Sequence, residues 1–224
     1  MDVVAHEIRT PLSLIKGAAE LLESAGPLTD EQKQFTKTIQ TNAEHAIAVA
    51  EDFLTLAKLD ASGDHLSPET FDLRELTRQT ARDLRAIHDF PILIRDSGQP
   101  ITITADRNLI RQALWNLINN AIRHADTHSQ VMVRTYSTSE HACIEVRDLG
   151  SGISPNDRDS LFVPFQQLGH EGAAATGQGA GLGLAIVDRI VALHGGELLV
   201  DSLLGRGTSI HVLLPFEQSP RRSK

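Results

Sequence analysis

The sequence predicts an α+β protein in which an N-terminal helical hairpin, paired with a second copy as a dimeric four-helix bundle, precedes an α/β sandwich. Three observations lead to this fold class. Apolar residues recur at heptad spacing in the first part of the chain, a short segment rich in helix breakers follows, and the remainder mixes helix-like with strand-like patterns. The 224 residues are enough for two such units.

The first unit carries an apolar seam on two successive segments. The seam residues are spaced alternately four and three apart, which is typical of packed helices. They are Val4, Ile8, Pro11, Ile15, Ala18 and Leu22, then Phe35, Ile39, Asn42, Ala46, Val49, Phe53 and Leu56. Gly26 and Pro27 end the first helix, and Thr29 with Gln32 forms a capping box that begins the second. Because a two-helix hairpin cannot bury both of its faces alone, we expect two copies to pair. Pro11 should bend the first helix, since proline removes a helical hydrogen bond.

The chain is expected to divide after the hairpin. Gly63 and Pro68 are breakers within the segment Ala-Ser-Gly-Asp-His-Leu-Ser-Pro. Charge also changes there, because residues 1–64 hold five Lys or Arg against eleven Asp or Glu, and the rest of the chain holds sixteen against eighteen. The expected units are a hairpin at 1–62, a linker at 63–68, an α/β unit at 69–217 and a flexible tail at 218–224.

The second unit combines both kinds of element. Helical periodicity is found at 71–87, 106–124 and 183–194, and strand-like alternation at 101–104, 130–136, 142–147, 197–201 and 208–214. Helices interleaved with strands that mostly read as hairpins predict one sheet covered on one face by helices.

Polar side chains of the helix at 106–124 are suited to a phosphate-bound cation. Asn116 and Asn120 lie four residues apart and therefore on one helical face, with Arg123 and His124 about one turn further along. Amide oxygens suit a hard cation such as Mg²⁺, which commonly keeps substrate phosphates among its ligands. This helix is therefore a candidate for one wall of a nucleotide site.

Glycine-rich segments downstream are suited to the rest of a nucleotide. Asp148 follows a strand in Asp-Leu-Gly-Ser-Gly152 and can accept a hydrogen bond from the amino group of a purine. The run at 177–183 opens a helix, where backbone N–H groups can approach phosphates, and the segment at 205–208 follows. Each segment alone also fits an ordinary turn or a polar helix face. Their order and intervals favour a nucleotide site.

Taken in order, these segments resemble the N, G1, G2 and G3 boxes of the GHKL-type ATP-binding fold, and Leu161-Phe162-Val-Pro-Phe165 resembles its F box. The match covers nearly all of residues 69–216. It implies ATP as the ligand, with Asn120 as the residue that holds Mg²⁺. The nucleotide-binding residues that it implies are Asn116, Asn120, Arg123, His124, Asp148, Gly150, Gly152, Ile153, Phe162, Phe165, Gly179, Gly181, Leu182, Gly183, Leu184 and Thr208.

In the first unit, His6-Glu7-Ile-Arg-Thr10-Pro-Leu resembles the H box of sensor histidine kinases. A neutral imidazole is a capable nucleophile near neutral pH. The resemblance implies that His6 accepts the phosphoryl group, that Glu7 orients the ring and takes its proton, and that Thr10 positions a water for dephosphorylating the partner. His6 lies off the apolar seam, so we expect its side chain to face solvent.

The end of the F box, the lid segment and His124 depart from the family pattern. Gln166 follows Phe165 where a basic residue often ends the F box, and the lid segment at 167–177 contains no Lys or Arg, which leaves Arg123 as the best basic candidate for the phosphates. His124 stands where the family often has an aromatic residue. Asn116 replaces the Glu that activates water in ATP-hydrolysing relatives, so the resemblance implies slow hydrolysis.

Two classes of function stay open at this point. The first is an enzyme that phosphorylates its own His6 from ATP and passes the phosphoryl group to an aspartate in the receiver domain of a response regulator, with regulator phosphatase activity alongside. The alternative is a non-catalytic or phosphatase-biased dimerisation module, in which bound nucleotide only controls access to the hairpin.

Composition narrows the expected surroundings. The net charge of −8 argues against nucleic acid as a ligand, because phosphate backbones are bound by clustered Lys and Arg. No apolar run is long enough to span a bilayer, so we expect no membrane contact in this chain, although the full-length protein can still be membrane-anchored. A lone Cys143 cannot form an intrachain disulfide, which favours a reducing compartment such as the cytoplasm. No cap precedes the first helix at Met1, as expected for a segment of a longer protein.

Overall fold

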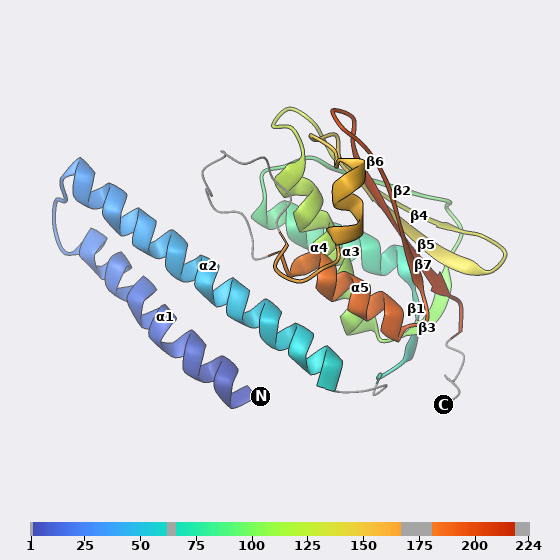
Figure 1. The fold of residues 1–224 in the computed structure, drawn as a ribbon, viewed down its shortest axis with the longest axis horizontal. Helices are drawn as coiled ribbons and strands as arrows, with labels where there is room; N and C mark the ends of the chain where they lie inside the picture. Colours follow the sequence, from blue (N-terminus) through green and yellow to red (C-terminus); the bar gives the residue numbers. More distant parts are fainter. Residues whose placement is uncertain (1, 62–65, 167–180, 218–224) are drawn as a thin grey trace.

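The protein is described by a computed structural model that covers residues 2–61, 66–166 and 181–217, with the main chain alone for residues 2–7 and 159. Its first part is a hairpin of two long helices, α1 (Asp2–Ser24) and α2 (Asp30–Ala61). Its second part is an α/β domain that lies alongside the hairpin, with α2 between α1 and the domain (Figure 1). Among the helices within these ranges, none is long and apolar enough to cross a membrane.

The turn of the hairpin forms as its sequence predicts. The Gln32 N–H donates to Thr29 Oγ1 over 3.2 Å, and the Thr29 N–H donates to Gln32 Oε1 over 2.9 Å, which confirms the capping box. Helix α1 continues through Pro11. Two ion pairs between the antiparallel helices, Arg9 with Glu51 and Lys16 with Glu44, each close to 2.7 Å. They are exposed and so add little stability, but their order along both helices matches the antiparallel register.

The α/β domain contains seven strands and three α-helices within the described ranges. Their bounds are β1 (Glu69–Asp72), α3 (Leu73–Ile87), β2 (Ile92–Asp96), β3 (Thr102–Ala105), α4 (Arg107–His124), β4 (Val131–Ser137), β5 (His141–Arg147), a 3₁₀ turn η1 (Pro155–Ser160), α5 (Gly183–Leu193), β6 (Glu197–Leu203) and β7 (Gly207–Pro215).

The strands form a large sheet and a small one. The large sheet has the order β2-β4-β5-β7-β6, in which β2 pairs with β4 in parallel and the other neighbours are antiparallel. The strands β1 and β3 pair separately. Helices α3, α4 and α5 cover one face of the large sheet (Figure 1). The predicted α+β class, a helical region followed by a one-sided sandwich, is therefore confirmed.

The core lies between α4, α5 and the covered face of the sheet. Leu114 and Ile118 of α4 and Ile186 of α5 are fully buried there, in the same apolar cluster as Ile144 of β5. Burial of this apolar surface is the main stabilising term, at about 25 cal/mol per Å². It also holds the opposite, polar face of α4 in a fixed place.

Some local predictions were wrong. Phe71 and Asp72 belong to β1 rather than to a helix, and the Asp72 side chain caps α3 by accepting from the Arg74 N–H. The sequence analysis missed β2 and the small second sheet. Arg74, which heads a row of arginines with helical spacing, is buried because Asp72 and Asp96 neutralise it at 2.9 and 3.9 Å.

A buried histidine joins the end of α5 to the start of α4. His194 Nε2 accepts from the Asp106 N–H over 3.0 Å, and His194 Nδ1 lies 2.7 Å from the carbonyl oxygen of Ile190. A neutral ring protonated at Nδ1 satisfies both contacts, whereas a charged ring would oppose the Asp106 N–H. Burial accordingly lowers the pKa of His194. Asp106 in turn caps α4, so this contact fixes the helix that carries Asn116 and Asn120.

The stability of the domain should fall in mild acid because of His194. A histidine whose pKa is lowered by folding binds its proton more readily in the unfolded chain. The contribution of His194 to the free energy of unfolding is therefore fully present above the ordinary pKa of 6.5, and it is lost as the pH falls from 6.5 towards the lower pKa of the folded state. Glutamine can donate to Ile190 and accept from Asp106 without titrating. In urea denaturation across about pH 5 to 8, we expect His194→Gln to lose less stability on acidification than the wild type.

The matched control is His128→Gln, which removes an exposed histidine from the turn before β4. It should follow the wild-type curve. Identical pH dependence in wild type and His194→Gln would show that His194 is not the group responsible.

Candidate functional site

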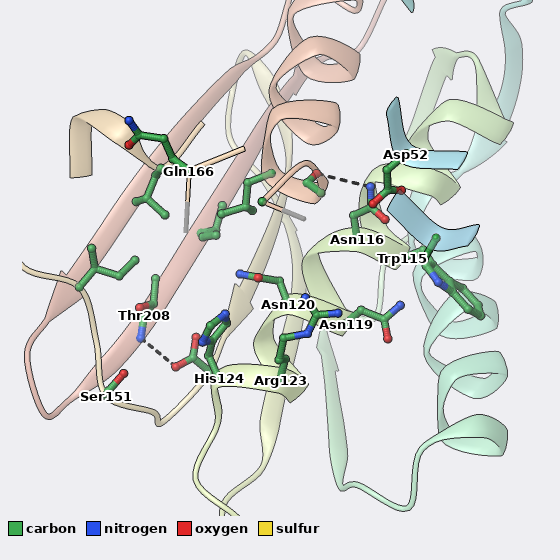
Figure 2. Close-up of a pocket in the computed structure, with 18 of the residues that line it drawn as sticks. Asp52, Trp115, Asn116, Asn119, Asn120, Arg123, His124, Ser151, Gln166 and Thr208 are labelled. Atoms are coloured by element: carbon green, nitrogen blue, oxygen red, sulfur yellow. Dashed lines mark hydrogen bonds between the residues drawn. The ribbon is translucent and has the colours of Figure 1, made fainter. Parts of the chain in front are cut away.

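A cavity of about 500 Å³ lies between α2 and the helical layer of the α/β domain. Helix α4 forms its floor, and the loop after β5, the start of α5 and part of β7 form further walls (Figure 2). These segments are distant in sequence, and it is the folding of the sheet and its helices that brings their polar groups together.

One face of α4 supplies a row of polar side chains. Asn116, Asn120 and Arg123 follow one another along the cavity (Figure 2), as the spacing of four and three residues predicts. Asn116 Nδ2 donates to the Gly183 carbonyl over 3.4 Å, which leaves the amide oxygen of Asn116 for a ligand. Arg123 is exposed at the cavity. The row therefore offers neutral oxygen ligands followed by a cation.

Asp148 is fixed at the end of β5 by two backbone donors, one from the loop after β5 and one from the start of β7. Its Oδ1 accepts from the Gly150 N–H over 2.9 Å and from the Thr208 N–H over 3.2 Å. Gly207 makes this approach possible, because it has a φ of +84° and a Cβ there would lie 2.1 Å from the Asp148 carbonyl oxygen. Asp148 is 7% exposed, so its second carboxylate oxygen is the part that a ligand in the cavity can reach.

Burial shifts the pKa values of two neighbouring groups in opposite directions. Removal from water raises the pKa of Asp148, an effect opposed by the N–H groups of Gly150 and Thr208. The ring of His124 is accessible from the cavity, but the surrounding protein limits hydration of its charged form and lowers its pKa, with Arg123 acting in the same sense. The cavity therefore pairs a buried acceptor with a histidine that favours its neutral form.

The F-box segment ends in an unusual conformation. Phe165 has a φ of 65°, and it is the one non-glycine residue with positive φ in the described part of the chain. Its N–H donates to the Gly181 carbonyl over 3.2 Å, and a Cβ at Gly181 would lie 2.4 Å from the Gln166 carbonyl oxygen. The main chain at residues 165–166, before the predicted lid segment, therefore lies directly against the main chain at Gly181, after it.

The structure brings most of the predicted nucleotide residues into this cavity. Those that line it are Asn116, Asn120, Arg123, His124, Asp148, Gly152, Ile153, Gly181, Gly183, Leu184 and Thr208. Gly150 acts through its N–H on Asp148, and Leu182 is buried in the core. Phe162 and Phe165 do not line the cavity, and Gly179 lies outside the described residues.

The residues predicted for phosphoryl chemistry lie on α1. His6 and Glu7 fall in the first turns of the helix, where only the main chain is described, so their side chains lie outside the described part. Thr10 follows one turn later and is exposed.

The sequence analysis missed the wall formed by α2. His45, Ala48, Val49 and Asp52 of α2 line the cavity, opposite His88, Trp115 and Asn119. His88 Nε2 lies 2.8 Å from Asn119 Oδ1, and Trp115 packs partly against the core. The sequence analysis placed Val49 in the apolar seam of the bundle, and this was wrong, because Val49 lines the cavity. Helical spacing groups residues 45, 49 and 52 on one face, but it does not identify the surface that this face contacts.

Two protein families match this chain, one in the α/β domain and one in the helical hairpin. The family described as "Histidine kinase-, DNA gyrase B-, and HSP90-like ATPase" matches residues 105–218. The family described as "His Kinase A (phospho-acceptor) domain" matches residues 1–62.

Individual relatives align with nearly the whole chain. Histidine protein kinase DivJ of Caulobacter vibrioides is 34% identical over 222 residues, which cover 97% of this chain and 37% of DivJ. Circadian input-output histidine kinase CikA of Synechococcus elongatus is 32% identical over 222 residues, covering 96% of this chain and 29% of CikA. This chain thus spans less than half the length of these two relatives.

A solved structure agrees with both parts. The crystal structure of full-length ShkA in complex with AMPPNP superposes with a TM-score of 0.76 at 31% identity, covering 97% of this chain and 46% of that chain. With two family matches in this order and a fold shared along the chain, the protein belongs to the histidine kinase, DNA gyrase B and HSP90-like ATPase family, as the catalytic core of a sensor histidine kinase.

Proposed function

We propose that this chain binds ATP with Mg²⁺ in the cavity, transfers the γ-phosphoryl group to His6 and passes it to an aspartate in the receiver domain of a response regulator. The observation that carries the proposal is the convergence of Asn116, Asn120, Arg123 and Asp148 in one cavity beside a hairpin that bears His6. The AMPPNP bound to ShkA supports an adenine nucleotide as the ligand.

The adenine end of the nucleotide is assigned to Asp148. Its carboxylate is held by two backbone N–H groups and can accept from the exocyclic amino group of adenine with its second oxygen. A buried acceptor of this kind discriminates against bases that lack a donor there, because it would be left unpaired. Thr208 lies beside it and completes this end of the cavity.

The phosphate end is assigned to the polar row of α4. The amide oxygens of Asn116 and Asn120 are hard, neutral donors of the kind that Mg²⁺ accepts, so the residues present fit this ion. When bound, Mg²⁺ would supply charge neutralisation to the phosphates. Arg123 supplies a fixed positive charge at the same end, which offsets the absence of basic residues from the predicted lid.

The transfer step balances with His6 as the nucleophile. One ring nitrogen attacks the γ-phosphorus, the bond from that phosphorus to the bridging oxygen breaks, and ADP leaves. The Glu7 carboxylate takes the proton from the other ring nitrogen. The same phosphoryl group then passes to a receiver-domain carboxylate. An exposed Thr10, one turn after His6, supports a regulator phosphatase activity in which its hydroxyl orients a water.

A homodimer is proposed from the apolar surface of the hairpin. Ile15 and Ile39 of the predicted seam are 48% and 44% exposed in the single chain. Phe53 is 51% exposed, although its ring also lies near that of Phe165 in the α/β domain. Leu14 and Phe35 add to this surface. A second copy that packs on it would form the four-helix bundle.

Replacing the phosphoacceptor should separate binding from chemistry. We expect His6→Gln to abolish acid-labile, base-stable labelling from γ-radiolabelled ATP, because no nucleophile remains at that position. ADP affinity measured by calorimetry should stay at the wild-type value, since the cavity lies on the other side of α2 from α1. Stoichiometric labelling of the variant at another residue would contradict the assignment.

Asn120 should be required for Mg²⁺-dependent binding. Asn120→Ala removes an oxygen ligand at the phosphate end and should cost about 2 kcal/mol of ADP binding in the presence of Mg²⁺. Calorimetry with and without Mg²⁺ measures the difference. Asn108→Ala is the control, because Asn108 is exposed near the start of the same helix. An equal ADP affinity for both variants would exclude the proposed role of Asn120.

The dimer should depend on the seam. Ile39→Asp places a charge on the proposed contact surface and should give a monomer in light scattering at micromolar concentration. Thr41→Asp is the control, because a position two residues along lies on nearly the opposite side of the helix. A wild-type chain that is already monomeric would refute the proposed dimer.

A further inference from the structure

The docked hairpin contacts the α/β domain through one face of α2. Arg189 of α5 forms an ion pair with Asp60 at 2.9 Å, and Leu59 is buried in the domain core. The rings of Phe53 and Phe165 lie 6.4 Å apart, within the usual range for aromatic pairs. These contacts hold the C-terminal part of α2, residues 53–60, against the domain, next to the part of α2 that lines the cavity.

One further residue of this face enters the cavity as a charge. Asp52 is partly buried and lies beside Asn116, with Asn120 and Arg123 further along α4 (Figure 2). Burial raises the pKa of Asp52, and the positive charge of Arg123 lowers it. The two side chains form no direct ion pair among the described residues, so the carboxylate and the guanidinium interact across the cavity.

We propose that Asp52 causes nucleotide binding and docking of α2 to weaken each other. The Asp52 carboxylate and the phosphates of the nucleotide are both negative and compete for the positive charge of Arg123. This inference rests on the proposed nucleotide binding and adds a regulatory role for a hairpin residue. Without nucleotide, the attraction between Asp52 and Arg123 favours docking. With nucleotide, the phosphates engage Arg123 and repel Asp52.

The coupling acts in both directions by thermodynamic necessity. If docked α2 weakens the binding of phosphates by some factor, bound phosphates weaken the docking of α2 by the same factor. Helix α2 lies between α1 and the domain, so the docked domain is separated by α2 from the helix of its own chain that carries His6 (Figure 1). Binding of the substrate would therefore assist the release of the domain that transfer to the His6 of the same chain requires.

The opposite role for Asp52 is that of a metal ligand. A carboxylate near two amide oxygens can also hold Mg²⁺. The two roles predict opposite signs. A competing carboxylate weakens nucleotide binding, with or without the metal, whereas a ligating carboxylate strengthens binding only when Mg²⁺ is present.

The test is the affinity of the intact chain for ADP and for adenosine, measured by calorimetry with Mg²⁺ and again in a chelator. We expect Asp52→Asn to bind ADP about fivefold more tightly than the wild type under both conditions, at the lower end of typical coupling factors. Adenosine affinity should not change, because adenosine has no phosphates. Glu51→Gln is the matched control, because it removes the same negative charge from a neighbouring residue that pairs with Arg9 of α1 and does not line the cavity.

A second measurement follows the docking itself. Hydrogen exchange of the main chain over residues 45–60 should accelerate when ADP binds to the wild type, and this acceleration should be smaller in Asp52→Asn. Unchanged or weaker ADP binding by Asp52→Asn, or an equal gain in Glu51→Gln, would overturn the inference. A wild type that binds no ADP would overturn the proposed function and this inference with it, whereas normal ADP binding without an effect of Asp52→Asn would overturn the inference alone.

Discussion

The geometry of the site depends on one buried carboxylate. Asp148 Oδ1 accepts from the N–H groups of Gly150 and Thr208, and so ties the loop after β5 to the first residues of β7. A buried carboxylate is costly unless donors satisfy it, so these two bonds offset its desolvation and also fix the side chain. Its second oxygen is consequently preorganised before any ligand arrives. Helix α4, anchored through Asp106 and His194, presents Asn116 and Asn120 to the same cavity.

Features set by local spacing could be predicted from the sequence. The capping box at Thr29 and Gln32 formed because both partners lie within one helical turn. Asn116, Asn120 and Arg123 share a face because helical geometry alone requires it. The glycine-rich segments had their expected order, and Gly152, Gly181 and Gly183 reached the cavity. In each case the information that placed the residue lies within a few positions of it.

Features set by packing between distant segments could not be predicted. The strand β1 is only four residues long and is held by β3, and Arg74 is buried between Asp72, two residues earlier, and Asp96 at the end of β2, whose approach the local sequence does not show. The contribution of α2 to the cavity is of the same kind. Asp52 stands in an acidic, helical stretch that resembles many solvent-exposed surfaces, and it becomes part of the site only when α2 docks.

Helix α2 must therefore serve three surfaces at once. One face packs on α1, a second is exposed and apolar, and a third lines the cavity that we propose for the nucleotide. In the described part of the chain, an ion pair joins the hairpin to the domain, between an exposed Asp60 and a half-buried Arg189, and partly exposed ion pairs contribute little stability. The proposed function requires α2 to release the α/β domain before a receiver domain can approach the hairpin. Weak contacts between α2 and the α/β domain make this release possible. A single charge such as Asp52 can then decide whether α2 is docked, since a free-energy difference of about 1.4 kcal/mol changes the equilibrium between docked and released α2 tenfold.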